Sequence, residues 1–157
     1  LAIASADVAS ISERRTDRFL DVARNRKLPA FLAHDPGVDS GLMIAQYTQA
    51  ALVSENKRLA FPASVDSIPS SAMQEDHVSM GWHAARKLRK SLDNLRRVIA
   101  IELIAAARAV EMRAPLKPSP VTGELISILR KRVPGPGPDR DLAPELEAAY
   151  ELLLHKG

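Results

Sequence analysis

The sequence predicts an all-α protein built around long helices. No segment shows the period-two alternation of polar and apolar residues that marks a half-buried strand. Glycine and proline divide the chain into lengths suited to helices. Between about residues 78 and 110, apolar residues recur at steps of three and four, which is typical of one long helix packed along a stripe. A helix of that length indicates a bundle larger than one small domain.

The first predicted helix runs from about Ala2 to Phe19, and an irregular loop through residues 34–37 follows it. The second is expected from Gly41 to about Leu59, where Asp39 or Ser40 can accept hydrogen bonds from its first free amides. Apolar residues occupy nearly every side of this second helix. We therefore expect it to be surrounded by neighbours.

The third predicted helix begins near His77 or Val78 and reaches Val110. Prolines in residues 115–120 end it, because proline removes a backbone donor and restricts its predecessor. A short helix over about Val121 to Arg132 follows, and then a last helix with Pro144 near its first turn and His155 and Lys156 at its C-terminal end. The apolar stripe of the third helix consists of Ala85, Leu88, Leu92, Leu95, Ile99, Leu103, Ala106 and Val110.

Charge and composition argue against a nucleic-acid-binding protein. The chain has 157 residues, of which 22 are basic and 19 acidic, so its net charge is only +3. Aromatic residues make up 4% of the chain, too few to provide stacking platforms for bases. The basic residues lie on predicted helices, where a solvated face is their ordinary place. We expect no nucleic-acid partner.

Several other classes are disfavoured by what the sequence lacks. Without cysteine there is no disulfide framework, and the composition fits a reducing compartment such as the cytoplasm. No two histidines lie four apart on a helix, so we expect no metal site. The most apolar stretch, residues 42–53, is interrupted by polar residues and too short to span a membrane. Because Leu1 is preceded by neither methionine nor signal sequence, we expect a piece of a longer protein.

Residues 68–80 hold the densest group of ionisable and hydrogen-bonding side chains. They include the adjacent carboxylates Glu75 and Asp76 and the imidazole of His77, on a stretch without apolar periodicity. Such a concentration of acid and base favours a functional role. Spacing alone favours a simpler interpretation, in which these side chains are solvated and Asp76 caps the next helix. Trp82, the single tryptophan, is expected to anchor packing at that helix start.

Several blocks of sequence in a fixed order are more specific than any single motif. They are Ser-Glu-Arg-Arg at 12–15, Ser-Gly-Leu-Met-Ile-Ala-Gln at 40–46, Ser-Glu-Asn-Lys at 54–57, Ser-Val-Asp-Ser-Ile-Pro at 64–69, Gln-Glu-Asp-His-Val-Ser-Met-Gly at 74–81, Ala-Ile-Glu-Leu at 100–103 and Leu-Ala-Pro-Glu at 142–145. In order and spacing they resemble the C-terminal part of the histidine ammonia-lyase family, and the resemblance covers nearly the whole chain.

The resemblance implies an all-helical lyase of the aromatic amino acid ammonia-lyase superfamily, a homotetramer whose central bundle uses long helices from all four subunits. It implies that residues 1–157 are the C-terminal helical region, with central-bundle helices over about 1–110 and short peripheral helices over about 120–157. The superfamily's electrophile is 4-methylideneimidazol-5-one (MIO), formed from an internal Ala-Ser-Gly. This chain has no Ala-Ser-Gly. We therefore expect MIO to come from sequence upstream of Leu1, and the isolated piece to be inactive.

Of the family's active-site residues, the resemblance carries over Glu75. In histidine ammonia-lyases the glutamate of the Gln-Glu-Asp-His block lines the substrate pocket, where a carboxylate can hold the imidazole or take part in proton transfer. Relatives acting on phenylalanine or tyrosine typically have glutamine there, because a ring without nitrogens offers a carboxylate no donor. We expect Gln74 and His77 to lie just outside the pocket and to support Glu75.

The resemblance thus implies loss of ammonia from L-histidine to give urocanate, the first step of histidine breakdown, with this chain supplying part of the active site. Two alternatives stay open. One is a tyrosine or phenylalanine ammonia-lyase, or an aminomutase, of the same superfamily. The other is a helical interaction module without catalysis.

Overall fold

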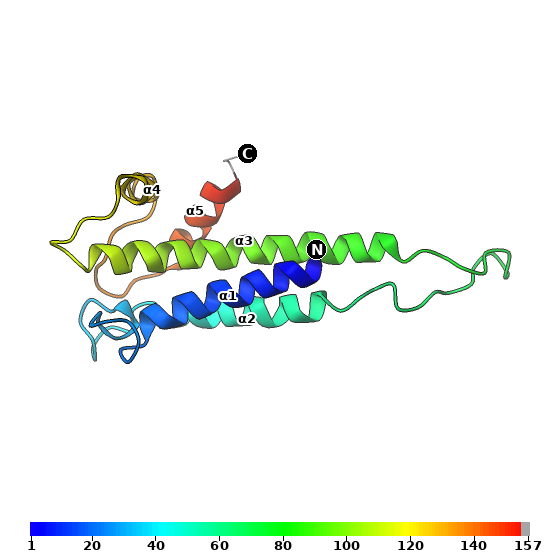
Figure 1. Ribbon diagram of the computed structural model, residues 1–157, viewed down its shortest axis with the longest axis horizontal. Helices are drawn as coiled ribbons and strands as arrows, with labels where there is room; N and C mark the ends of the chain where they lie inside the picture. The colour runs from blue at the N-terminus through cyan, green and yellow to red at the C-terminus, as the bar shows by residue number, and fades with distance from the viewer. Residues whose placement is uncertain (155–157) are drawn as a thin grey trace.

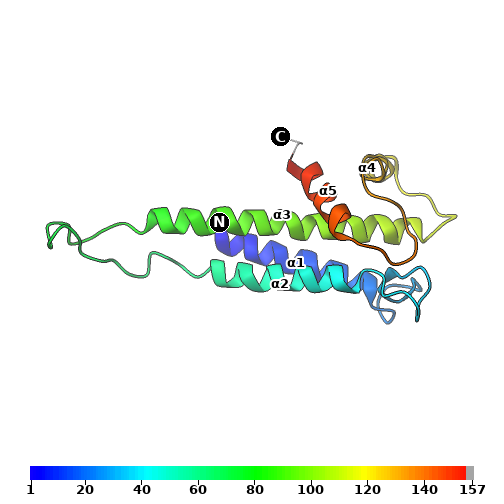
Figure 2. The same cartoon turned by 180° about the vertical axis from the view of Figure 1, so that it is seen from behind.

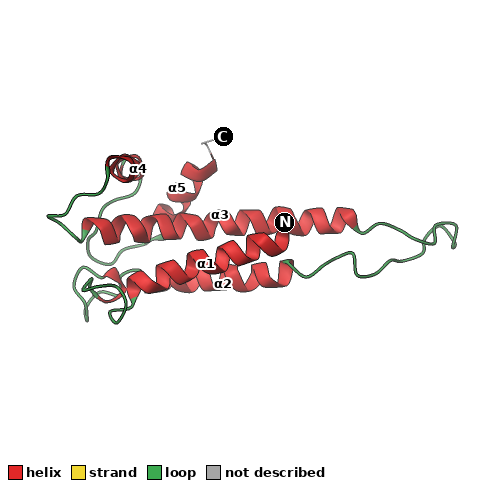
Figure 3. Cartoon of the chain, viewed as in Figure 1, coloured by secondary structure: helices red, strands yellow, loops and turns green. Residues whose placement is uncertain are grey.

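The computed structural model describes residues 1–154 as five α-helices and one short 3-10 helix (Figures 1 and 3). In chain order they are α1 (Ala2–Leu20), η1 (Ala30–Leu32), α2 (Met43–Leu59), α3 (Gly81–Glu111), α4 (Pro120–Arg130) and α5 (Ala143–Leu154). No strand occurs in these residues, so the all-α prediction is confirmed. His155 and Lys156, expected at the end of the last helix, lie outside the described residues.

The three long helices α1, α2 and α3 lie side by side, and each contacts the other two. The chain runs along α2 in the direction opposite to α1 and α3 (Figures 1 and 2). α5 packs against α3, and α4 lies beside the C-terminal end of α3. None of the described helices is both long and apolar enough to cross a lipid bilayer. We refer to α1–α3 as the bundle.

Small apolar residues let the bundle helices approach closely. Ala9 of α1 and Val98 of α3 are completely buried, and Val53 of α2 packs with them. Near the C-terminal end of α3, one cluster joins α3 to the loops after α1, and another joins it to α4 and α5 through Leu129 and Ala149. Burial of this apolar surface is the main stabilising contribution, at about 25 cal/mol per Å².

The buried face of α3 is not the apolar stripe that the sequence predicts. That stripe is half-buried or exposed, and Leu92 has 38% of its surface accessible. The face toward α1 and α2 instead carries Ser91, Asn94 and Val98. Apolar periodicity therefore does not identify the face of α3 that packs on α1 and α2, because polar side chains of α3 find partners inside the bundle.

A layer of buried polar side chains connects all three bundle helices. The Asn56 Nδ2 donates to the Ser91 carbonyl at 3.2 Å, and the Asn94 Nδ2 donates to the Asn56 Oδ1 at 3.1 Å. The Ser91 hydroxyl lies 3.0 Å from that of Ser5, and the Gln49 Nε2 donates to the Val98 carbonyl at 2.7 Å. Because these groups are sealed from water, losing one partner leaves another unsatisfied.

The helix ends agree with the sequence to within a few residues, but the predicted caps were wrong. The N-cap position of α2 is Leu42, which makes no side-chain cap. Asp39 instead accepts hydrogen bonds from the backbone amides of Asp35 (3.0 Å) and Asp139 (3.1 Å). α2 also has an open side, because Tyr47 is 65% exposed in this chain. The polar residues before α2 correctly indicated a turn there. They did not indicate which backbone amides donate to Asp39.

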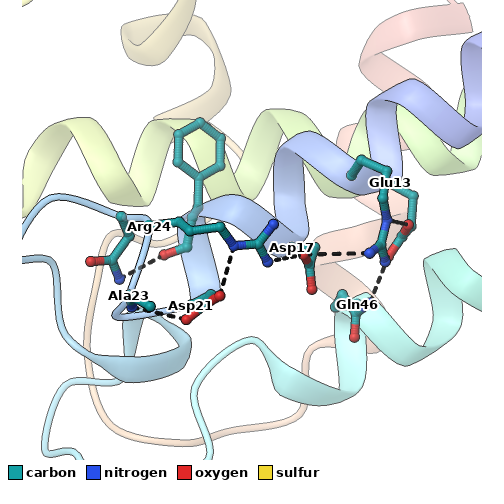
Figure 4. Close-up of polar contacts among 9 residues, drawn as sticks. Glu13, Asp17, Asp21, Ala23, Arg24 and Gln46 are labelled. Carbon is teal, nitrogen blue, oxygen red and sulfur yellow. Dashed lines mark hydrogen bonds and ion pairs between the residues drawn. The ribbon is translucent and has the colours of Figure 1, made fainter.

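A group of charged side chains joins the end of α1 to α2 (Figure 4). Arg24 forms ion pairs with Asp17 and with Asp21, the latter at 2.7 Å. The Gln46 Nε2 of α2 donates to the Glu13 Oε1 of α1 at 2.6 Å. The two ion pairs hold the end of α1 to the residues that follow it, and the hydrogen bond of Gln46 joins α1 to the start of α2.

Candidate active-site arm

Residues 60–80, which connect α2 to α3, form a long arm that extends away from the bundle (Figures 1 and 2). Pro62 and Pro69 prevent the arm from continuing the helices, because proline lacks the amide that a helix requires. The arm is part of no helix, and most of its residues are exposed. Its shape must therefore come from its own hydrogen bonds.

Two pairs of hydrogen bonds hold the two sides of the arm together. The Ser67 hydroxyl accepts from the Val78 amide at 2.7 Å and donates to the Val78 carbonyl at 3.0 Å. Further out, the Ser70 amide donates to the Glu75 carbonyl at 2.9 Å, and the Glu75 amide donates back to the Ser70 carbonyl at 3.2 Å. Together they place Glu75 at the outer end of an antiparallel two-sided arm.

The tip of the arm has an unusual backbone. Ser71, Ala72 and Met73 have φ values of 52°, 52° and 71°, in the left-handed region that non-glycine residues rarely occupy. Each such residue costs roughly 1–2 kcal/mol. Strain of this kind is concentrated at functional sites, so the turn immediately before Gln74 and Glu75 supports a functional role for the arm.

The three predicted site residues all lie on the arm, but the structure does not gather them into a pocket. Gln74, Glu75 and His77 are exposed, and within residues 1–154 their side chains make no hydrogen bond or ion pair. The free Glu75 carboxylate can accept a hydrogen bond from any donor presented to it. Its pocket would need surfaces that this arm does not itself provide.

Two expectations for neighbouring residues were wrong. α3 begins at Gly81, so Asp76 lies too far before the helix to cap it, and the Ser79 hydroxyl accepts the Gly81 amide instead. Trp82 is 79% exposed and anchors no packing in this chain. The first error comes from placing the helix start three or four residues too early, whereas Trp82 does lie at the start of α3 but finds no neighbour within the described residues.

One feature of the arm was not predicted from the sequence, namely a series of exposed apolar side chains. More than 60% of the surface of each is accessible, and they are Phe61, Val65, Ile68 and Met73, to which Trp82 at the start of α3 adds another. The signal in the sequence that could have predicted these exposed side chains is the occurrence of apolar residues in a polar segment that contains prolines. Exposed apolar surface of this extent marks a contact surface for another protein segment.

The sequence blocks that carry the family resemblance divide into two kinds in the structure. The Ser12 hydroxyl donates to the Glu102 Oε2 at 2.6 Å, and the Arg15 Nη2 donates to the same oxygen at 2.8 Å. The Asn94 Nδ2 donates to the Glu55 Oε2 at 2.8 Å. The helices of the bundle are therefore held together in part by residues of blocks 12–15, 54–57 and 100–103. Block 74–81 has no such packing role.

The triplet that shares Ser-Gly with Ala-Ser-Gly does not fit a prosthetic group. It is Asp39-Ser40-Gly41, whose Ser40 and Gly41 amides donate to the Asp139 carboxylate at 2.6 and 2.9 Å. Gly41 has a φ of 58°, and a Cβ there would lie 2.5 Å from the Phe31 carbonyl oxygen. This triplet is a structural junction. Nor does any group of three or more histidine, aspartate or glutamate side chains in the described residues suit a metal ion.

Comparison with known proteins identifies the family of this chain. Residues 1–131 match the model of the aromatic amino acid lyase family. The chain therefore belongs to that family. It is 70% identical over 150 residues to a histidine ammonia-lyase of Streptomyces avermitilis, covering 95% of this chain and 29% of that protein.

Two solved structures share the fold. The histidine ammonia-lyase of Trypanosoma cruzi superposes with a TM-score of 0.94 at 44% identity, covering 98% of this chain and 30% of that one. The tyrosine aminomutase of Streptomyces globisporus gives 0.92 at 37% identity, covering 97% and 29%. The chain thus spans about 30% of the length of the relatives that it matches.

Proposed function

We propose that this chain is the C-terminal part of a histidine ammonia-lyase, which eliminates ammonia from L-histidine to give urocanate. The observation that supports this most directly is the 70% identity to a relative that bears that name, across nearly the whole chain. Identity to the tyrosine aminomutase, at 37%, is far lower, which favours histidine over tyrosine as the substrate.

In this proposal Glu75 contacts the substrate. Its carboxylate accepts a hydrogen bond from the imidazole ring or takes up a proton during loss of ammonia. The exposed, unpaired position of Glu75 on the arm supports this, because a carboxylate engaged in packing would not be available. Gln74 and His77, its neighbours on the arm, support its position.

The proposal also assigns the active site to several subunits of a homotetramer. The arm extends from its own bundle with exposed apolar side chains, and the stripe of α3 that includes Leu92 is only partly covered. Surfaces of this kind fit a larger bundle in which α1–α3 are central and α4–α5 are peripheral. The absence of cysteine fits a cytoplasmic enzyme.

The proposed reaction needs an electrophile that these residues do not form, since the chain has no Ala-Ser-Gly and Asp39-Ser40-Gly41 does not fit the group. MIO would supply that electrophile from another part of the enzyme. What this chain supplies is the carboxylate of Glu75 and the arm that holds it.

The test uses the full-length enzyme that contains this chain, assayed with histidine, tyrosine and phenylalanine. Histidine should give ammonia and urocanate at the highest kcat/KM. Glu75→Gln should lower kcat for histidine by roughly 10²–10⁴, the usual contribution of an acid or base, while the tetramer and Tm stay unchanged.

Asp76→Asn is the matched control, because it removes the neighbouring carboxylate from the same exposed arm. It should leave kcat within a factor of about two. Near wild-type kinetics for Glu75→Gln would remove Glu75 from the mechanism. Preferential turnover of tyrosine or phenylalanine would instead overturn the substrate assignment.

A further inference from the structure

A cavity of about 430 Å³ lies where the start of α2, the C-terminal part of α3 and the segment before α5 meet. Its volume is near the lower end of the range for small-molecule sites, roughly 300–1,000 Å³. About 40 Å of helix separates its α3 residue, Arg108, from Gly81 at the base of the arm, at 1.5 Å per residue. Nothing in the proposed reaction uses this cavity.

The cavity is lined by a buried arginine that has one donor without an acceptor. Arg108 is only 5% exposed, and its Nη2 donates to the Gly137 carbonyl at 3.0 Å. Its Nε has no hydrogen-bond partner in the described residues. Burial, and then the nearby charge of Arg140, lowers the pKa of Arg108 below its ordinary value. A buried guanidinium with an unsatisfied donor is costly, and a ligand carboxylate in the cavity that Arg108 lines would offset that cost through charge.

Two carboxylates balance that cation. Asp139 accepts the Ser40 and Gly41 amides, and these hydrogen bonds, that of Ser40 first, hold the pKa of Asp139 below its ordinary value. Asp141 uses its Oδ1 to accept the Ala143 amide at 2.9 Å. Arg140 is already engaged by the Glu145 carboxylate and the Gly135 carbonyl. The cavity thus presents one arginine that forms no ion pair within residues 1–154 and two carboxylates near it.

The start of α2 lines the cavity together with Arg108. The Ile44 and Ala45 residues line the cavity, and their first-turn amides have no acceptor in the part of the chain that the structure describes. This end of a helix also carries partial positive charge. A carboxylate fits there. The remaining wall is apolar, from Leu142 and Leu146.

We propose that this cavity binds an α-amino acid with an apolar side chain. Its carboxylate lies against Arg108 and the α2 amides, its ammonium faces Asp139 and Asp141, and its side chain packs on Leu142. A simple anion would be repelled by both aspartates, and a simple cation by Arg108, so the zwitterion satisfies both halves. This site goes beyond the proposed reaction, whose substrate contact on this chain is Glu75.

The first experiment is calorimetric titration of the full-length protein with three probes. L-leucine carries both charges, 4-methylpentanoate lacks the ammonium, and 3-methylbutylamine lacks the carboxylate. Leucine should bind at least about tenfold more tightly than either analogue, because each loses one charge-assisted contact. An analogue that binds as tightly as leucine would overturn the proposal. So would the absence of any heat of binding from leucine, since the cavity would then hold only water.

The second experiment locates the site with variants. Arg108→Met should weaken leucine binding about tenfold or more, and Asp141→Asn, which retains an oxygen for the Ala143 amide, should weaken it severalfold. Arg113→Met is the matched control, since Arg113 also donates to a carbonyl, that of Asn25 at 2.9 Å, but does not line the cavity. It should bind leucine like the wild type.

Two further readouts keep the result interpretable. Thermal melting establishes that each variant is folded, and if Arg108→Met does not fold, Asp141→Asn decides alone. Glu75→Gln should bind leucine as the wild type does. A loss of leucine binding in Glu75→Gln would place the ligand at the arm and overturn the proposal, whereas the proposed lyase reaction would be unaffected by that outcome.

Discussion

The bundle and the arm of this chain are held by different kinds of interaction. The bundle buries apolar clusters and a layer of polar side chains between α1, α2 and α3. The arm, residues 60–80, is held by a few hydrogen bonds across itself, and most of its side chains face outward. In the proposed function, the segment with the least packing carries Glu75, the residue that contacts the substrate. Changes in the bundle should therefore affect stability, and changes in the arm should affect activity.

The largest effect on stability is expected at the junction before α2. Gly41→Ala places a Cβ 2.5 Å from the Phe31 carbonyl oxygen at a φ of 58°. We expect a loss of roughly 2–3 kcal/mol in the free energy of unfolding, because both the backbone strain and the clash must be relieved. Denaturant unfolding of the full-length protein measures it. An unchanged midpoint would mean that the junction is softer than the structure indicates.

The next largest effect is expected in the polar layer. Asn56→Ala removes the donor to the Ser91 carbonyl and the acceptor of Asn94, which should cost about 1–3 kcal/mol. Thermal melting should show the lower Tm, with little change in kcat. Gln74→Ala, which truncates an exposed amide on the arm, should leave Tm unchanged. Equal losses from both variants would contradict the contrast between bundle and arm.

A smaller effect, on activity, is expected at the base of the arm. Ser67→Ala removes both hydrogen bonds to Val78, so Glu75 should be held less well and kcat/KM should fall about tenfold. Ser70→Ala is the control, because Ser70 uses its backbone rather than its hydroxyl. A fall in Tm with unchanged kcat/KM for Ser67→Ala would show that the arm supports the bundle instead.

The smallest effect concerns acid stability. Lys90, followed by Asn94, lowers the pKa of Glu55 below its ordinary 4.5. A carboxyl whose pKa is lower in the folded state stabilises the protein above its unfolded pKa, and this contribution is lost as the pH falls through the folded pKa. Glu55→Gln should therefore flatten the loss of stability below about pH 4.5, by less than about 1 kcal/mol because the pair is partly exposed.

Denaturation midpoints measured between pH 3 and pH 7 test this. Glu124→Gln is the control, since Glu124 is exposed and forms no ion pair in the described residues. If the two variants show the same pH dependence, Glu55 does not contribute through Lys90.

The elements of the bundle could be predicted because they depend on local rules. A polar cluster at residues 24–27 placed the end of α1, proline and glycine placed the ends of α4 within a few residues, and periodicity identified α3. The buried face of α3 could not be predicted, since Asn94 and Ser91 are satisfied by groups far away in the sequence. Such partners are visible only once the helices are side by side.

The candidate site shows the same limit. The sequence indicated Glu75 through its resemblance to a family, and chemistry alone left capping as the simpler interpretation. The cavity at Arg108 could not be predicted, because its lining comes from residues 40–48, 108 and 138–146, which only the folded chain brings together. Neither Arg108 nor Asp141 belongs to a local motif.

The length of α3 has a consequence for insertions and deletions. This single helix of 31 residues joins the arm at one end to α4 and α5 at the other. One inserted residue would turn everything beyond it by about 100° and shift it by about 1.5 Å. Homologous chains should therefore vary in length in the segments 113–119 and 134–138 while keeping α3 at one fixed length. The length of α3 thus fixes how far the arm lies from α4 and α5, and how the two ends are rotated relative to each other.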